Sequence, residues 1–263
     1  MKYQIFFYLF ISINLLSIRP MNIWGKFIGG AAGFALGGPL GALIGALAGH
    51  AVDKVAPIKH KDNDITKSLA FTAGIIALSA KMAKADGFVS QEEISTFKKL
   101  VEIPPENINT VGKLWELAKQ TTDGYDSYAN QIASLFPHGS PVLEKLIDLL
   151  FEIAKSDGVI KPEEELYLKN VASIFRINEE SFQRLLDFHE NRENPFSILG
   201  VSSKDSDEKI KSAWKSLVIQ NHPDHLIGQG MPKEFIISAS QRLADINSAY
   251  DAIKNKRLGK VKQ

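Results

Sequence analysis

The sequence predicts an all-α protein, with a transmembrane helix near its N-terminus, a helical bundle in the middle and a helical hairpin at its C-terminus. Residues 23–52 form a long apolar run in which Lys26 is the one strongly charged side chain. Two similar helix–turn–helix patterns follow, 71 positions apart. In the last third of the chain, apolar residues keep helical spacing on both sides of a His-Pro-Asp turn, His222, Pro223 and Asp224.

Composition narrows the classes of function. The chain has 263 residues, a formal net charge of +1 and no cysteine. A near-neutral balance gives no global field for nucleic acid, so no nucleic-acid partner is expected. The absence of cysteine excludes disulfides, thiol nucleophiles and cysteine-based zinc sites. We expect no cofactor.

Residues 1–22 form an apolar N-terminal extension whose origin the sequence leaves open. Residues 3–18 have the character of a signal-peptide core, of a short first span, or of a stretch that is not translated because Met21 is the start. The sequence favours Met21, because Trp24 then lies at an interface position directly before the apolar run.

The run at residues 23–52 exceeds the roughly 20 apolar residues that cross a bilayer. It carries a glycine at every fourth position, and small residues at that spacing let two membrane helices approach closely. We therefore expect a homodimer through this helix, the alternative being a monomeric anchor whose glycines face lipid. Pro39 predicts a kink or a break, with a re-entrant hairpin as the lesser possibility. The glycine stripe consists of Gly25, Gly29, Gly33, Gly37, Gly41, Gly45 and Gly49.

Flanking charges predict the orientation of the anchor. Lys54, Lys59 and Lys61 lie in the charged linker at residues 53–64, against Lys26 alone before the run. Positive residues favour the cytoplasmic side. We expect a single-pass protein of the inner (plasma) membrane, with its N-terminus outside and its C-terminal domains in the cytoplasm.

The middle of the chain contains an internal repeat. The stretch AKADGFVSQEE at residues 83–93 matches AKSDGVIKPEE at residues 154–164. Each copy lies between two apolar helical runs, so each predicts a helix, a tight turn and a second helix. Gly87 and Gly158 suit a positive φ where the first helix ends.

The acidic turns resemble the second half of a calcium-binding EF-hand loop. The oxygen ligands of the first half are missing, because Lys84 and Lys155 occupy one of the required positions. Turn and cap structure is therefore the favoured interpretation, and no metal is predicted. The weak candidates for a looser metal site are Asp86, Glu93, Asp157 and Glu164.

Paired helical repeats over residues 65–190 resemble the TerB-like domain. The resemblance implies an all-helical module that makes metal or partner contacts, and it assigns no ligands in this chain.

The C-terminal part predicts two antiparallel helices that hold up the His-Pro-Asp turn on a loop tip. A short helix ends at Gly200, and Ser206 caps the next one. Pro223 must end this second helix at His222. A long helix is expected from Lys233 to Ile253.

The words PFSILGV, HPD and INSAYDAI, in this order, make residues 191–257 resemble a J-domain of the DnaJ family, followed by a basic tail at residues 258–263. The resemblance implies that His222, Pro223 and Asp224 engage a DnaK-type chaperone and stimulate its ATP hydrolysis. It also implies that Lys211, Trp214 and Lys215 dock on that partner. The chain departs from the usual pattern with tryptophan at 214, where tyrosine is common, which leaves the strength of docking open.

From Met21 onward the order of parts resembles the DjlA-type membrane-anchored DnaJ-like proteins. The resemblance implies a co-chaperone that is not itself an enzyme and whose clients the sequence does not identify. One alternative makes the glycine stripe an oligomeric membrane scaffold, with the soluble domains as partner-binding modules. Another makes His222, Asp224 and His225 the metal cluster of a hydrolase.

Overall fold

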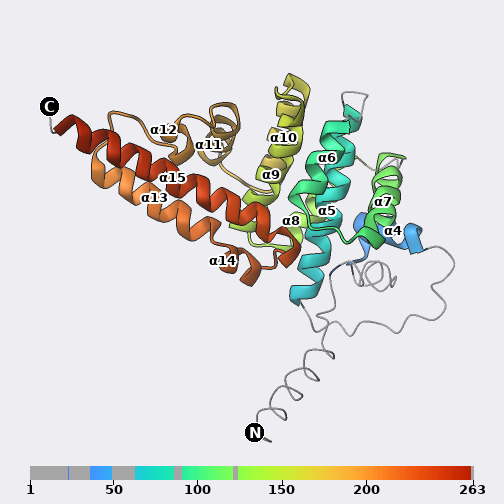
Figure 1. Ribbon diagram of the computed structural model, residues 1–263. Coiled ribbons are helices and arrows are strands. Elements are labelled where there is room, and N and C mark those ends of the chain that lie inside the picture. Colours follow the sequence, from blue (N-terminus) through green and yellow to red (C-terminus); the bar gives the residue numbers. More distant parts are fainter. Residues whose placement is uncertain (1–22, 24–35, 49–62, 86–90, 121–123, 262–263) are drawn as a thin grey trace, which may run out of the picture.

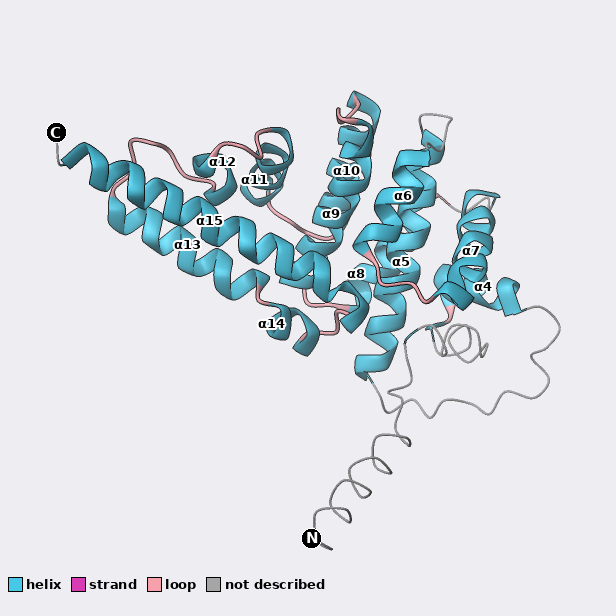
Figure 2. Cartoon of the chain, in the orientation of Figure 1, coloured by secondary structure: helices cyan, strands magenta, loops and turns pink. Residues whose placement is uncertain are grey.

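The computed structural model describes Ile23 and residues 36–48, 63–85, 91–120 and 124–261, and within them it contains helices and no strand (Figures 1 and 2). The predicted all-α class is confirmed. Helices of the first half are α4 (Gly38–Ala48), α5 (Asn63–Ala85), α6 (Gln91–Leu100), η2 (Pro105–Asn107), α7 (Ile108–Gln120) and α8 (Tyr125–Leu135). Those of the second half are α9 (Pro141–Ala154), η3 (Lys155–Asp157), α10 (Pro162–Ile174), α11 (Glu179–Glu190), α12 (Pro195–Leu199), α13 (Asp207–Asn221), α14 (Pro223–Gly228), η4 (Lys233–Phe235) and α15 (Ile236–Val261).

Helix α5 is the central element of the bundle. Every residue from Leu69 to Ala83 is buried, and the helix contacts α4, α7, α8, α9 and α10. A helix surrounded by other helices is buried on all sides, which explains why most of this stretch is apolar. Gly74 lets α8 approach, since a Cβ there would lie 2.5 Å from Cδ1 of Ile132. Within the described residues, α5 is also the one helix long and apolar enough to cross a membrane, but 78% of that window is buried in the protein.

The described part of the glycine-rich run packs on this bundle. Leu40, Leu43 and Ile44 of α4 are at most 2% exposed, and α4 contacts α5, α7 and α8. The side chain of Gln131 on α8 accepts a hydrogen bond from the N–H of Leu40 (2.8 Å) and donates to the carbonyls of Leu36 (3.0 Å) and Gly37 (2.8 Å). One side-chain amide thus satisfies backbone groups that a helix end leaves open.

A single helix from 23 to 52 is not what the described residues form. Gly37 and Gly38 have φ of +56° and +55°, so regular helical geometry is interrupted directly before Pro39. The sequence predicts a kink or a break at this proline. Gly41 and Gly45 lie on α4 after that break. The other members of the glycine stripe, Gly25, Gly29, Gly33 and Gly49, lie outside the described residues, and so do residues 1–22.

The two copies of the repeat have matching positions. Helices α6 and α10 begin 71 residues apart, and Glu93 and Glu164 are both buried, at 4% and 1% exposure. Gly158 has the predicted positive φ, +104°, whereas Gly87 lies outside the described residues. These features support the internal repeat, which stays a prediction.

The C-terminal part follows the sequence closely, with two differences. Gly200 ends α12 at a φ of +62°, and Ser206 caps α13 by accepting from the N–H of Lys209. The His-Pro-Asp turn does not lead into a plain loop, because Pro223 and Asp224 form the first turn of α14. The long helix predicted from Lys233 begins instead with η4, and α15 extends to Val261.

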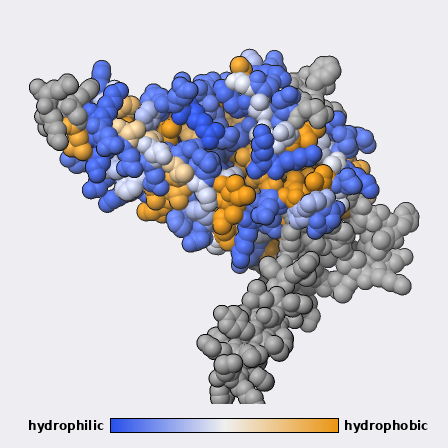
Figure 3. Space-filling view, viewed as in Figure 1, coloured by the Kyte–Doolittle hydropathy of each residue, from blue (hydrophilic) through white to orange (hydrophobic). Residues whose placement is uncertain are grey.

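The C-terminal helices lie against the bundle. Leu226, Met231, Phe235 and Ala239 belong to the same buried cluster as α5 and α9, and the ring of Phe235 meets that of Phe71 edge-on at 4.9 Å. Figure 1 shows α13 and α15 as a long antiparallel pair that reaches away from this contact. Outside the undescribed part, hydrophilic residues cover most of the face in Figure 3, with apolar residues in small patches.

Candidate functional site

The His-Pro-Asp turn is held by a specific local geometry. His222 leaves helical conformation with ψ of 127°, and Pro223 follows as the first residue of α14. Pro disfavours helical geometry in the residue before it, which explains why α13 ends here. The N–H of Asp224 donates to Nδ1 of His222 at 3.3 Å. The neutral imidazole must therefore carry its proton on Nε2, and the side chain is a donor on its free side.

The turn is open to solvent. The side chains of His222 and Asp224 are 49% and 88% exposed. The structure thus presents the turn outward at the junction of α13 and α14, as the sequence predicts.

A stripe of exposed side chains leads along α13 to this turn. Lys211, Lys215 and Ile219 are exposed and spaced by four residues, so they lie on one face of the helix. Ile219 is 63% exposed, which is unusual for a large apolar side chain. Sequence reasoning missed Ile219, although its spacing from Lys215 was a signal. Two positive charges beside an apolar contact suit a protein partner with an acidic surface.

Trp214 packs within the C-terminal hairpin, on the apolar face that helical spacing gives to α13. Its ring stacks on that of Tyr250 at 4.4 Å, and its indole N–H donates to Asn247 at 2.9 Å. The side chain is half-buried between α13 and α15. Its ring and its donor are engaged within the hairpin, and docking through Trp214 stays a prediction.

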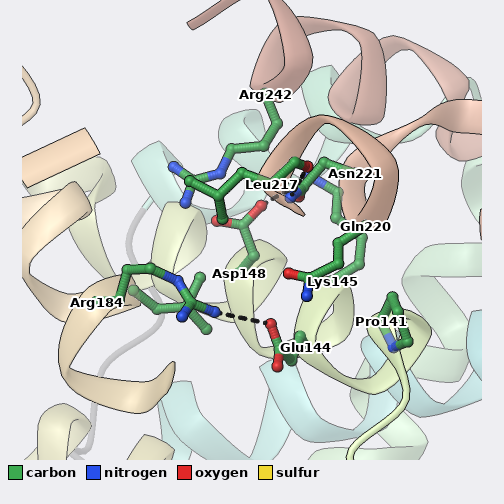
Figure 4. Close-up of a pocket in the computed structure, with 10 residues that line it drawn as sticks. Pro141, Glu144, Lys145, Asp148, Arg184, Leu217, Gln220, Asn221 and Arg242 are labelled. Atoms are coloured by element: carbon green, nitrogen blue, oxygen red, sulfur yellow. Dashed lines mark hydrogen bonds and ion pairs between the residues drawn. The ribbon is translucent and has the colours of Figure 1, made fainter. Parts of the chain in front are cut away.

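The opposite face of α13 meets the bundle. Leu217, Gln220 and Asn221 line a space of about 10 Å³ together with α9, α11 and α15 (Figure 4). A water needs about 10–15 Å³, so this is a closely packed contact rather than a ligand pocket. On its far side, the guanidinium of Arg184 pairs with Glu144 at 3.2 Å (Figure 4).

Buried charges lie at the centre of this contact. Nζ of Lys145 is 2.8 Å from Oδ2 of Asp148, and Nε2 of His189 is 2.9 Å from Oδ1 of the same carboxylate. Lys145 also donates to the backbone carbonyl of Ser238 at 3.3 Å, which ties α9 to α15. Burial by itself raises the pKa of Asp148, but the charges of Lys145 and Arg242 and the hydrogen bond with His189 outweigh it and hold the pKa well below its ordinary value.

Arg242 of α15 completes the cluster. It is 4% exposed, and its guanidinium carbon lies 3.3 Å from the centroid of the Phe188 ring, a cation–π contact. Its Nε and Nη1 have no hydrogen-bond partner among the residues that the structure describes. Nearby, Arg192 joins the two sides by pairing with Glu152 (3.2 Å) and Asp245 (2.8 Å).

Two of the candidate metal residues, Glu164 and Asp157, have structural partners. The carboxylate of Glu164 accepts the N–H of Lys161 and caps α10, and Asp157 pairs with Lys161 at 3.5 Å. Asp86 lies outside the described residues. Within the described ranges, no group of three or more His, Asp or Glu side chains is arranged to hold a metal, and the hydrolase cluster of His222, Asp224 and His225 is not formed.

Comparisons with known proteins agree with this architecture. The family described as co-chaperone DjlA transmembrane domain matches residues 21–78, tellurite resistance protein TerB matches residues 72–187, and the DnaJ domain matches residues 194–259. A co-chaperone protein DjlA of Shewanella oneidensis is 28% identical, over 90% of this chain and 99% of its own length. Proteins of the same name from Coxiella burnetii and Escherichia coli are each 24% identical over 90% of this chain and 99% of their own lengths. No solved structure matches.

The fold, the turn and these matches define a membrane-anchored J-domain protein. The three family matches follow one another along the chain, and the relative from Shewanella oneidensis aligns over 90% of it. The chain is therefore similar over nearly its whole length to the DjlA-type co-chaperones, and these matches support a membrane-associated J-domain co-chaperone.

Proposed function

We propose that the chain recruits a DnaK-type chaperone to the cytoplasmic face of the membrane and stimulates its ATP hydrolysis. The observation that carries this proposal is the exposed His222-Pro223-Asp224 turn at the end of a basic stripe on α13. The lysines steer and hold the partner through long-range attraction, and the turn makes the short-range contact that triggers hydrolysis.

The chemistry of His222 fits a trigger that acts by contact. With Nδ1 accepting from the backbone, the ring is oriented and presents Nε2–H to the partner. The exposed carboxylate of Asp224 offers an acceptor beside it. The chain contributes no nucleophile, so the chemical step belongs to the partner's own active site.

The test is single-turnover ATP hydrolysis by the cognate DnaK-type chaperone, with the full chain in lipid nanodiscs. Stimulation by the wild type and its loss in His222→Gln is the expected result. His225→Gln is the matched control, because His225 is an exposed histidine on the adjacent helix turn. If both variants were inactive, the turn would act through both histidines and the proposal would be wrong in its mechanism.

The anchor is proposed to come from the glycine-rich run, with the soluble domains in the cytoplasm. Residues 23–36 alone are shorter than the roughly 20 residues that a spanning helix needs. Crossing as one helix therefore requires α4 to leave its place on the bundle. Since the chain has no cysteine, a single Asn255→Cys can be labelled with an impermeant maleimide. We expect labelling in inverted vesicles and none in right-side-out ones, and the reverse result would contradict the orientation.

We also propose a homodimer through the glycine stripe and contacts with client proteins through the TerB-like domain. Gly33→Leu, upstream of the break, should lower crosslinking between two copies in the membrane. Ala42→Leu is the control, because Ala42 is an exposed position of α4 outside the stripe. Equal crosslinking in both variants would contradict the dimer.

A further inference from the structure

The J-domain and the TerB-like domain exchange core residues. Residues 191–194 alone connect α11 to α12. Phe188 of α11 is fully buried in the core of the J-domain hairpin, whereas Met231 and Phe235, which follow α13, are buried in the core of the bundle. Each domain thus completes the hydrophobic core of the other, which a freely tethered domain does not do.

A cluster of buried charged residues lies where α9, α11 and α15 meet. Lys145 and Asp148 come from α9, His189 from α11, and Arg242 from α15. All four are at most 4% exposed. Apolar contacts alone allow two surfaces to slide, but a shift of α15 here would take the ammonium of Lys145 from the carbonyl of Ser238 (3.3 Å) and move the buried guanidinium of Arg242 away from the negative charge of Asp148, which is costly in a buried environment.

One face of helix α13 contacts the bundle and another face is exposed to solvent. Leu217, Gln220 and Asn221 turn toward the bundle, and Figure 4 shows them facing the cluster. Lys211, Lys215 and Ile219 are exposed to solvent. The face that carries the basic stripe is therefore left free by the contact.

We propose that Lys145, Asp148 and Arg242 form an interdomain lock that holds the J-domain in one orientation, with its basic stripe turned outward and available to the partner. Arg242 and Asp148 are then positioning residues, which act on docking through the orientation of α13. The docking role of the basic stripe rests on the proposed function, whereas the fixed orientation of the J-domain does not. The competing interpretation is an inhibitory clasp, and the exposure of Lys211 and Lys215 argues against it.

The first test measures the orientation directly. Leu166→Cys on α10 and Asn255→Cys on α15 are exposed sites for spin labels in a chain without cysteine. Pulsed electron–electron double resonance on the full chain in nanodiscs should give one narrow distance distribution, provided that the labelled chain is diluted with excess unlabelled chain so that pairs across the proposed homodimer do not contribute. Arg242→Met, which keeps an apolar stem against Phe188, should broaden it, and Asp148→Asn is the second variant. Arg257→Met is the matched control on the same helix, because Arg257 contacts only the J-domain in the interactions described.

The second test measures docking. If loosening leaves the stripe correctly oriented only part of the time, the concentration of co-chaperone for half-maximal stimulation should rise by roughly three-fold in Arg242→Met, with the maximal rate unchanged. A role in stability alone would lower the unfolding temperature without this change.

The outcomes separate the two proposals. A broad distribution in the wild type, or an unchanged one in both lock variants, would overturn the lock. Stronger stimulation by Arg242→Met would reveal an inhibitory clasp and would overturn it too. A narrow distribution that broadens in the variants, without any stimulation by the wild type, would support the lock and contradict the proposed function.

Discussion

The two ends of the J-domain hairpin carry their charges in opposite environments. At the end that meets the bundle, Arg242 is 4% exposed and lies among buried charges and aromatic rings. At the far end, Arg257 pairs with Asp207, whose side chain is 76% exposed, and donates to the carbonyls of Ser203 and Asp205. The near end is therefore held by packing against the bundle, which is distant in sequence, whereas the far end is held by contacts with the loop directly before α13.

Removing the apolar core of the near end should have the largest effect. Phe235→Ala deletes a fully buried ring of η4, directly before α15, that packs against Phe71 of α5. We expect a loss of about 3–5 kcal/mol in the free energy of unfolding, because a large side chain is lost and a cavity remains. Urea unfolding of the full chain in detergent measures it. Ile237→Ala, two residues on and 55% exposed, is the control. Equal losses in both variants would show that the near end does not depend on this burial.

Breaking the buried ion pair should come next. Asp148→Asn leaves Lys145 and Arg242 without their counter-charge, which costs about 3 kcal/mol. The same urea measurement at neutral pH reports it. A variant as stable as the wild type would mean that the pair offers specificity of orientation without net stability.

Acid should weaken the near end selectively. The folded-state pKa of Asp148 lies well below 3.8, so its carboxylate stabilises the fold above that value. This contribution is lost as the pH falls from about 4 toward the folded-state pKa, because protonation then favours the unfolded chain. Acid unfolding should therefore depend less on pH in Asp148→Asn. Identical acid profiles would contradict the assignment.

Within the hairpin, Trp214→Phe should have a smaller effect. The substitution keeps the stacking on Tyr250 and removes the hydrogen bond to the exposed Asn247, so we expect a loss of about 0.5–1 kcal/mol. Stimulation of the partner should be unchanged. A large rise in the co-chaperone concentration that gives half-maximal stimulation would show that Trp214 also docks on the partner.

The far end should be least sensitive. Arg257→Met removes an ion pair with an exposed partner, and such pairs contribute about 0–1 kcal/mol. Thermal unfolding in low and high salt should show a small change that salt reduces. A loss as large as that of Asp148→Asn would erase the contrast between the two ends.

Several local features were predictable from the sequence. The positive φ of Gly158 and Gly200 and the cap at Ser206 depend on neighbouring residues, so spacing and residue type sufficed. The short helix α14 was missed, although proline at its first position and Asp224 in its first turn are typical of a helix start. The exposed Ile219 could also have been found from its spacing.

Other features depended on contacts between distant parts of the chain. The apolar run before Gly158 predicts a helix where α9 lies, but no local pattern marks its Lys145 and Asp148 as a buried pair. Likewise, no local pattern places Gln131 on the break at Gly37, some 94 residues away.

The sequence by itself determined the helices, the order of the domains and the His222-Pro223-Asp224 turn, because helical periodicity, caps and proline geometry act over a few residues. Only the tertiary structure decided that the end of α13 packs on the bundle, where α4 packs, and that the charge of Arg242 acts on Asp148. These outcomes depend on burial of surfaces far apart in the chain, where the gain of apolar contact has to outweigh the cost of removing charges from water.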